Sequence, residues 1–326
     1  MHLAMDLIVI GFGTGGKLVA GAMGRHGARV AMIEQSDQMY GGTCINIGCV
    51  PTKSLVHLAE TRNPDADPDE WFRHAAYKTK NLTGLLRRKN FAALDAVETV
   101  TVITGRATFL DPHTVTVATR HDTLTVSAGV IVIDTGSEPV IPDIPGLSAC
   151  CHAYTSTGLL DTTQLPRRLA IIGGGNVGLE FASVYAQFGS SVTVLEESGR
   201  LFSHEDDDVA TAAISLLLDA GVNLRTGAHV TGIDDHAETA VVNYTHDGAE
   251  AAVEAEAILI AVGRVPATLG LGLHDAGVHT TDRGAVLVDD HLRSSRPHIY
   301  AVGDVNGGPQ FTYISHDDSR IVLDQL

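Results

Sequence analysis

Two cysteines, Cys44 and Cys49, are the side chains whose type and spacing most clearly indicate chemistry in this chain of 326 residues. On a regular helix, Cα atoms five residues apart are separated by about 8.6 Å, more than the roughly 4.4–6.8 Å that a disulfide tolerates. A bridge between the two therefore requires a distorted turn. Gly48 supplies the backbone freedom for such a turn, and Pro51 allows a helix to begin again after it. Because strain makes a disulfide easier to reduce, the spacing favours a redox-active pair.

Two other interpretations of this pair remain open. Thiols that pack as small apolar groups are the commoner fate of cysteines in a reducing compartment. Zinc binding is the other, but four intervening residues without a second cysteine pair or a nearby histidine fit it poorly, and we predict no metal site. Cys150 and Cys151 are adjacent in a connecting segment, and for them we expect the packing role.

The composition excludes several classes of partner. The chain has 22 Lys and Arg against 39 Asp and Glu, and its net charge of −17 repels phosphate backbones and anionic lipids, so we expect neither nucleic acid nor membrane as a partner. The apolar stretch at residues 7–10 follows Asp6 and precedes a glycine cluster, which is typical of a buried strand and not of a signal peptide. Four cysteines in so long a chain form no disulfide scaffold, and we expect a cytoplasmic protein.

A glycine-rich segment occurs twice in the sequence. Leu7-Ile-Val-Ile-Gly11-Phe-Gly13-Thr-Gly-Gly16 returns as Leu169-Ala-Ile-Ile-Gly173-Gly-Gly175-Asn-Val-Gly178. The offset that relates Gly11 to Gly173 also relates Glu34 to Glu196, so strand, glycine turn, helix, second strand and terminal acid repeat in register. This is the pattern of the Rossmann βαβ unit, which the chain therefore contains twice.

Each part of the repeated segment has a physical role in binding a dinucleotide. The first glycine permits the tight turn, the second lets the backbone approach the pyrophosphate, and the third allows close packing of helix on sheet. The unpaired N–H groups at the helix start favour the phosphates, and the acid can accept a hydrogen bond from a ribose hydroxyl. Two complete sites in one chain imply two dinucleotides with electron transfer between them.

We expect an α/β fold with two Rossmann-like domains, one inserted in the other. The outer domain comprises residues 1–147 and 267–326, and the inserted domain comprises residues 148–266. Pro139, Pro142 and Pro145 mark the connection between them. The other expected elements are a break at 63–70, a helix over 71–97, strands at 100–109, 114–118 and 130–134, and a strand-rich stretch at 230–262.

The segment from Gly41 to Lys53 resembles the active-site motif of the class I pyridine nucleotide-disulfide oxidoreductases. Thr135-Gly136, Gly263-Arg264 and Ala301-Val-Gly303-Asp304 also match family patterns in their expected order, so the resemblance spans the whole chain. Residues 34–40 and 310–318 are most similar to a bacterial branch linked to reactive-chlorine resistance; mercuric reductase and dihydrolipoamide dehydrogenase are more distant likenesses.

The resemblance implies a function and two cofactors. The outer domain would bind FAD, and the inserted domain would bind NADH or NADPH. Electrons would pass through the Cys44–Cys49 disulfide to a small oxidant or a metal ion such as Cu(II), in a role connected with oxidative stress. Because Glu196 would repel a 2′-phosphate, we predict a preference for NADH, although Arg200 lies nearby.

The resemblance also assigns roles to individual residues. Cys44 would be the interchange thiol that faces substrate, and Cys49 the thiolate that stacks on the flavin. Lys53 would pair with Glu180, because a buried cation beside the flavin stabilises the negative charge that develops on the reduced ring. The implied FAD-binding residues are Gly11, Gly13, Gly16, Glu34 and Asp304, and those for the nicotinamide cofactor are Gly173, Gly175, Gly178 and Glu196. The other implied cofactor-binding residues are Gly42, Thr43, Lys53, Thr135, Gly136, Gly263 and Gly303.

Two departures from the family pattern affect these expectations. Asn176 stands where many relatives place a tyrosine that gates the nicotinamide pocket, so the pocket is expected to be more open. The chain ends at Leu326, whereas family members continue into a dimerisation domain that supplies a His–Glu pair to the partner subunit. We therefore expect homodimers for full-length relatives, and a catalytically incomplete FAD-binding fragment stays open as an alternative.

Overall fold

The computed structural model describes residues 2–63, 65–202 and 205–326. The chain divides into two compact units. The first unit contains the residues through Asn46, Thr83–Glu138 and Val265–Leu326, and the second contains Ile47–Leu82 and Pro139–Arg264. Both units combine helices with a sheet that contains parallel strand pairs, which confirms the expected α/β fold with two Rossmann-like parts.

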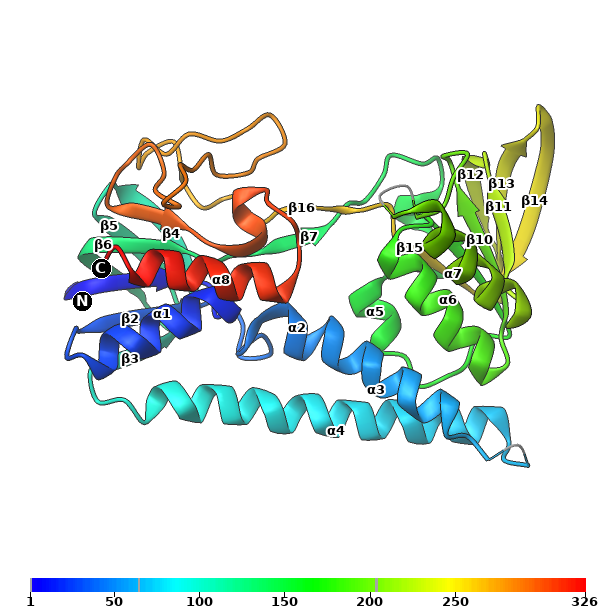
Figure 1. Ribbon diagram of the computed structural model, residues 1–326, viewed down its shortest axis with the longest axis horizontal. Helices are drawn as coiled ribbons and strands as arrows, with labels where there is room; N and C mark the ends of the chain where they lie inside the picture. The colour runs from blue at the N-terminus through cyan, green and yellow to red at the C-terminus, as the bar shows by residue number, and fades with distance from the viewer. Residues whose placement is uncertain (1, 64, 203–204) are drawn as a thin grey trace. The chain divides into compact units, whose positions relative to one another are not determined.

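The first unit is built on a seven-stranded sheet with the order β3-β2-β1-β6-β5-β4, in which β17 also pairs with β6 (Figure 1). Pairing is parallel from β3 to β6 and for β17, and antiparallel for β4 and β5. The strand expected at 114–118 is confirmed, the stretch expected at 100–109 is divided between β3 and β4, and that expected at 130–134 is the end of the longer strand β6. The bounds are β1 (His2–Ile10), β2 (Val30–Glu34), β3 (Val100–Thr104), β4 (Arg106–Asp111), β5 (Thr114–Ala118), β6 (Thr123–Ile133) and β17 (Ile299–Ala301).

Parallel register brings three strand ends of the first unit together. Ile10 pairs with Ile33 of β2 and with Ile133 of β6, and all three side chains are buried. The residues that follow these strands therefore meet at one edge of the sheet, where open α/β folds bind ligands. Helices α1 (Thr14–Arg25) and α8 (Thr312–Leu323) lie side by side in this unit, which also contains α2 (Gly42–Asn46) and the short η2 (Gly303–Asn306) (Figure 1).

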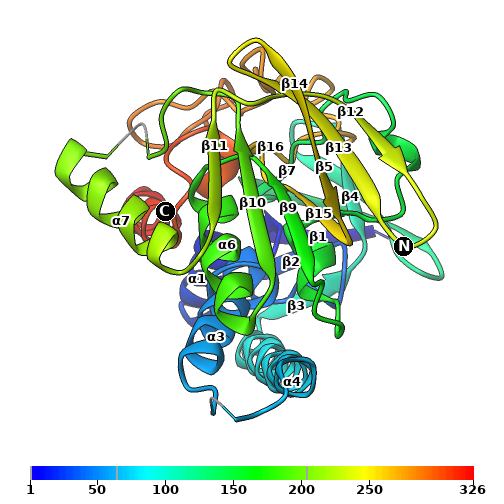
Figure 2. The same cartoon turned by 90° about the vertical axis from the view of Figure 1, so that its right-hand side faces the viewer.

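The second unit contains a five-stranded parallel sheet with the order β11-β10-β9-β15-β8 and a separate antiparallel sheet β12-β13-β14 (Figure 2). The antiparallel sheet and β15 come from the stretch at 230–262 that the sequence predicted to be strand-rich, whereas the other strands of the parallel sheet precede it. The bounds are β8 (Ala153–Thr155), β9 (Arg168–Ile172), β10 (Ser191–Glu196), β11 (Asn223–Thr226), β12 (His229–Asp235), β13 (Ala240–His246), β14 (Ala249–Ala255) and β15 (Ala257–Ile260). Short strands β7 (Ser137–Pro139) and β16 (Arg264–Pro266) pair with each other.

Aromatic packing holds helices together in the second unit. The Phe72 ring lies 5.5 Å from that of Tyr185 and 5.1 Å from that of Phe188, measured between centroids, and all three side chains are buried. Phe72 belongs to α4 (Pro68–Asp95), which confirms the helix expected over 71–97; the unit boundary falls within it, and Pro64 of the preceding break lies outside the described residues. The other helices are α3 (Cys49–Glu60), η1 (Leu147–Ala149), α5 (Ser156–Leu160), α6 (Asn176–Phe188) and α7 (Asp207–Asp219).

None of the helices in the described part of the chain is both long and apolar enough to span a bilayer.

Candidate active site

The first glycine turn, between β1 and α1, is shaped by Asp134 at the end of β6. Gly11 has φ +102°, and a Cβ at this position would lie 2.2 Å from the Asp134 carbonyl oxygen. A Cβ on Gly13 or Gly16 would lie 2.5 or 2.6 Å from the Asp134 carboxylate. The carboxylate also accepts a hydrogen bond of 2.7 Å from the Gly16 N–H. All three glycines are therefore required by the packing of this unit itself.

Glu34, at the end of β2, is fixed beside the same turn. Its carboxylate accepts hydrogen bonds from the Phe12 N–H at 2.9 Å and the Ser36 N–H at 3.1 Å. Burial raises the pKa of Glu34, and these backbone hydrogen bonds partly oppose the shift. The acid is thus held next to the glycine turn, in the position that a ribose hydroxyl contact requires.

The second glycine turn repeats these contacts. The Glu196 carboxylate accepts from the Gly174 N–H at 2.6 Å and from the Ser198 N–H at 2.8 Å. These two donors are the counterparts of Phe12 and Ser36 in the repeated segment, so the sequence repeat is also a repeat of hydrogen bonds. Burial raises the pKa of Glu196, but the hydrogen bonds outweigh it and the net shift is downward. Glu196 is therefore ionised at neutral pH.

One glycine of the second turn has no structural reason to lack a side chain. Gly173 has φ +108°, and a Cβ on Gly178 would lie 2.1 Å from the Gly173 carbonyl oxygen, so the fold itself requires both glycines. Gly175 has an ordinary φ of −78°, and no heavy atom of the described chain lies within 4 Å of its ideal Cβ. Open space at the N-terminus of α6 fits the close approach of a pyrophosphate.

A pocket of about 580 Å³ lies next to this turn, wholly within the second unit. Gly173, Glu196 and Val262 line it, together with His229 from β12. The volume lies within the range of ordinary ligand pockets, and its position at the carboxyl ends of β9 and β10 is where such sheets bind nucleotides. The second unit therefore has a site that fits a dinucleotide.

Polar groups in the first unit also fit a bound cofactor. The Thr135 hydroxyl oxygen is buried and has no hydrogen-bond partner among the described residues. A buried hydroxyl without a partner is costly, so it is well placed to bond a ligand. Asp304 accepts a 2.5 Å hydrogen bond from the Ser137 hydroxyl, and Gly303, with φ +70°, donates its N–H to Asp318 at 2.8 Å.

Cys44 lies in α2, which begins against the first glycine turn. A Cβ on Gly42, which has φ +77°, would lie 2.7 Å from the Gly13 Cα. Cys44 is half-buried, and it interacts electrostatically with Lys17 of α1. Burial lowers the pKa of Lys17, while Cys44 and Asp134 oppose this, and the ammonium donates to Asn90 at 2.9 Å. The lysine thus lies near enough to Cys44 for their charges to interact.

Cys49 is the first residue of α3 and is exposed. One turn further along α3, the Lys53 ammonium forms an ion pair with Glu180 of α6. The predicted pairing of Lys53 with Glu180 is thus present, and within the chain the Lys53 side chain is 70% exposed and that of Glu180 26% exposed.

The remaining predicted residues are distributed between the units. Thr43 lies half-buried in α2 of the first unit, and Gly136 of the same unit has φ +71°. Gly263 belongs to the second unit and has φ +126°, with no described heavy atom within 4 Å of its ideal Cβ.

The sequence did not predict two residues of the first unit, Lys17 and Asp134. Lys17 directly follows the third glycine of the turn, but its electrostatic interaction with Cys44 is visible only in the structure. Asp134 directly precedes Thr135-Gly136, and its equivalent after β15 in the second unit is Ala261. The sequence signal for Asp134 is therefore that positions 134 and 261 follow equivalent strands, yet only the first of them holds an acid.

The arrangement matches a known family over nearly all of the chain. Residues 5–319 match the family described as pyridine nucleotide-disulphide oxidoreductase. The chain belongs to this family. RclA of Escherichia coli (strain K12), a probable pyridine nucleotide-disulfide oxidoreductase, is 44% identical over 319 residues, which are 98% of this chain and 70% of that protein.

Two further comparisons agree with this membership. A mercuric reductase of Streptomyces lividans is 35% identical over 335 residues, covering 99% of this chain and 70% of that protein. A solved structure, the Cu(II) complex of the HOCl-induced flavoprotein disulfide reductase RclA from Escherichia coli, is 42% identical with a TM-score of 0.92, covering 99% of this chain and 70% of that one. The chain is thus an oxidoreductase of a family that uses FAD and a nicotinamide dinucleotide, and the two glycine turns, Thr135 and the pocket fit these groups.

Proposed function

We propose that the protein transfers electrons from NADH or NADPH to bound FAD and on through the Cys44–Cys49 pair to a small oxidant or a metal ion such as Cu(II). The observation that carries this proposal is the packing of Gly42 against Gly13. It means that the helix holding Cys44 begins at the glycine turn that fits FAD.

The electron count of the proposed reaction balances with these groups. When held by the first glycine turn and Thr135, FAD would supply two-electron redox chemistry between the nicotinamide and the disulfide. Two electrons and two protons convert the disulfide into two thiols, and their oxidation back to the disulfide would reduce two Cu(II) ions to Cu(I). Lys17 would stabilise a thiolate at Cys44, and Lys53, held by Glu180, would supply a positive charge one turn beyond Cys49.

The second unit supports a preference for NADH over NADPH. Ionised Glu196 would accept a hydrogen bond from a 2′-hydroxyl and repel a 2′-phosphate. Arg200 is the nearby cation that could offset this repulsion, but its guanidinium is 2.7 Å from the Asp207 carboxylate and also donates to the Glu205 carbonyl at 2.9 Å. Its charge is therefore partly neutralised by a neighbouring acid.

The relatives favour a metal ion among the acceptors. One relative is a mercuric reductase, and the RclA structure is a Cu(II) complex. Catalysis like that of mercuric reductase or dihydrolipoyl dehydrogenase is the alternative within the family. The non-catalytic alternative is a fragment that binds FAD without turnover. We further propose a cytoplasmic homodimer that acts in oxidative stress.

Steady-state NADH oxidation by the FAD-loaded protein, with Cu(II) or a small oxidant as acceptor, tests the proposal. We expect continuous turnover that Cys44→Ser abolishes, while ferricyanide reduction, which draws electrons from the flavin directly, persists in the variant. Unchanged Cu(II) reduction by Cys44→Ser would show that electrons pass from the flavin to the acceptor without the cysteines. A single stoichiometric reduction without turnover would show the incomplete fragment.

A further inference from the structure

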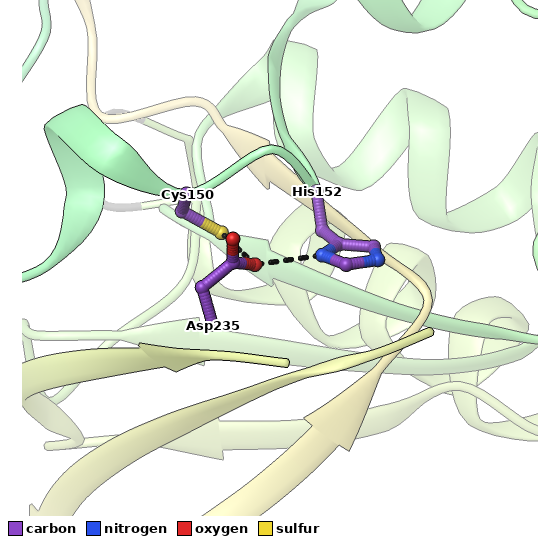
Figure 3. A group of neighbouring side chains, drawn as sticks. All are labelled: Cys150, His152 and Asp235. Atoms are coloured by element: carbon purple, nitrogen blue, oxygen red, sulfur yellow. Dashed lines mark hydrogen bonds and ion pairs between the residues drawn. The ribbon is translucent and has the colours of Figure 1, made fainter. Parts of the chain in front are cut away.

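Cys150, His152 and Asp235 form a compact group of potential metal ligands in the second unit (Figure 3). His152 Nδ1 lies 2.7 Å from Asp235 Oδ1, and Cys150 Sγ lies 3.3 Å from the same oxygen. One sulfur, one nitrogen and one oxygen thus lie within 4.8 Å of one another. The side chains of His152 and Asp235 are only 13% and 28% exposed.

Cys151 adds a second sulfur to this group. Its Sγ lies 3.4 Å from His152 Nδ1 and 3.8 Å from Asp235 Oδ1. The donor set is then two thiols, one imidazole and one carboxylate. Thiolate and imidazole ligands select thiophilic ions such as Zn²⁺ over Mg²⁺ or Ca²⁺, which prefer sets made only of oxygen.

Backbone contacts hold the two segments of this group in place. The Cys150 N–H donates to the Leu147 carbonyl at 3.1 Å, and Ile258 of β15 donates to the His152 carbonyl at 2.8 Å. Asp235 ends β12 and pairs with Ala240 of β13. Because separate elements fix the 150–152 loop and the end of β12, the ligands are organised before any ion binds.

The distances are close to those of a tetrahedral zinc site. With Zn–S of about 2.3 Å and Zn–N or Zn–O of about 2.0–2.1 Å, tetrahedral geometry separates neighbouring ligand atoms by about 3.3–3.8 Å. The sulfur distances to His152 and Asp235, 3.3, 3.4 and 3.8 Å, fall within this range. The hydrogen bond between His152 and Asp235 would need to widen by roughly 0.6 Å. The Cys151 sulfur would also need to turn toward that of Cys150, because the group whose ligand atoms all lie within 4.8 Å of one another consists of Cys150, His152 and Asp235.

The Asp235 carboxylate lies close to both sulfurs, with Oδ1 3.3 Å from Cys150 Sγ and 3.8 Å from Cys151 Sγ. A divalent cation bound between these atoms would stabilise thiolates beside the carboxylate.

We propose that Cys150, His152 and Asp235, with Cys151 as the fourth ligand, bind a thiophilic divalent cation of the Zn²⁺ type. Binding exchanges the two thiol protons for the metal, so Zn²⁺ and two thiols give a zinc dithiolate and two protons. The ion ties the 150–152 loop to the end of β12, two segments that are far apart in the sequence. The site is built entirely from the second unit and does not depend on the redox role proposed for Cys44 and Cys49.

Titration with Co²⁺ and Zn²⁺ tests this site. The FAD-loaded double variant Cys44→Ser/Cys49→Ser is the starting protein, because it removes the other two thiols. We expect one equivalent of Co²⁺ to give a thiolate-to-cobalt charge-transfer band and the visible bands of tetrahedral cobalt, in difference spectra against the metal-free protein. Zn²⁺ should displace the cobalt at one equivalent.

Ligand variants in the same background decide whether these residues bind the ion. Cys150→Ser or Asp235→Asn should weaken Co²⁺ binding by at least about 100-fold, since even loss of a supporting contact around a metal costs 10- to 100-fold. The matched control is His229→Ala, which removes another histidine of the second unit. His229 is also paired with a carboxylate, that of Glu197 at 2.9 Å, but this pair contains no sulfur. It should bind cobalt like the starting protein.

Three results would overturn the proposal. They are the absence of a thiolate-to-cobalt band, an undiminished band in Cys150→Ser, and equal weakening by His229→Ala. The flavin spectrum and the unfolding temperature without metal establish that each variant is folded. Should Cys150→Ser fail this check, Asp235→Asn gives the same test from the strand side of the site.

Discussion

Gly175→Ala separates the binding of the nicotinamide cofactor from the requirements of the fold. The residue caps α6 with φ −78° and ψ 179°, which alanine adopts without strain, and no described heavy atom lies within 4 Å of its ideal Cβ. Gly178→Ala is different, because its Cβ would lie 2.1 Å from the Gly173 carbonyl oxygen. The first substitution should therefore affect only a ligand, whereas the second should destabilise the unit.

The expected magnitudes follow from these contacts. Alanine is a poorer N-cap than glycine, so Gly175→Ala should lower the free energy of unfolding by about 1 kcal/mol or less. A methyl group placed where a pyrophosphate lies against the backbone should cost about 1–3 kcal/mol in binding, as overpacking does in protein cores. This corresponds to a roughly 5- to 150-fold rise in the Kd for NADH.

NADH affinity, flavin content and thermal unfolding of the purified variants provide the assay. Gly129→Ala is the matched control, since its ideal Cβ is equally open and it lies in β6 of the first unit. We expect weaker NADH binding with normal flavin content in Gly175→Ala alone. An unchanged Kd for NADH in that variant would refute the placement of the pyrophosphate at α6, and a large loss of stability would refute the assignment of Gly175 to a ligand.

Three further predictions concern charged residues. Glu196→Gln keeps an acceptor for the Gly174 N–H but removes the negative charge. The ratio of kcat/KM for NADPH to kcat/KM for NADH should therefore rise about 10-fold, which is equivalent to about 1.4 kcal/mol. An unchanged ratio would contradict the role of this charge. Lys53→Met should leave the unfolding temperature nearly unchanged, because the side chain is 70% exposed, yet slow flavin reduction by NADH about 10-fold or more in stopped-flow measurements; an unaltered rate would remove Lys53 from the site. Burial raises the pKa of Asp134 well above 3.8, so its ionisation opposes folding once the pH exceeds that value. Asp134→Asn should therefore raise the free energy of unfolding by about 1 kcal/mol or more at pH 7, with the gain disappearing below about pH 4. A gain in unfolding experiments that did not depend on pH would contradict this cause.

The repeated glycine segments allowed much of the fold to be predicted, because a strand, a tight turn and a helix in that order have one common arrangement in a parallel sheet. The constant offset between the two segments therefore predicted matched elements. The structure adds that the acids also make matched hydrogen bonds, Glu34 with the Phe12 N–H and Glu196 with the Gly174 N–H.

The features that the sequence did not predict depend on contacts between distant segments. Lys17 approaches Cys44 only because α2 packs on the glycine turn, and Asp134 enters that turn from the end of β6, a strand far along the chain from α1. The contacts of Cys150 and Cys151 with Asp235 could not be predicted either, because Asp235 belongs to β12, far along the chain. Local spacing carries no information on such partners, whereas strand order and register determine them.

Anaerobic titration of the FAD-loaded protein with NADH tests the central claim most directly. Two-electron reduction should produce a long-wavelength absorption band from a Cys49 thiolate against the oxidised flavin, and Cys49→Ser should lack it. Bleaching of the flavin by NADH with no such band in the unaltered protein would contradict electron transfer through the Cys44–Cys49 pair.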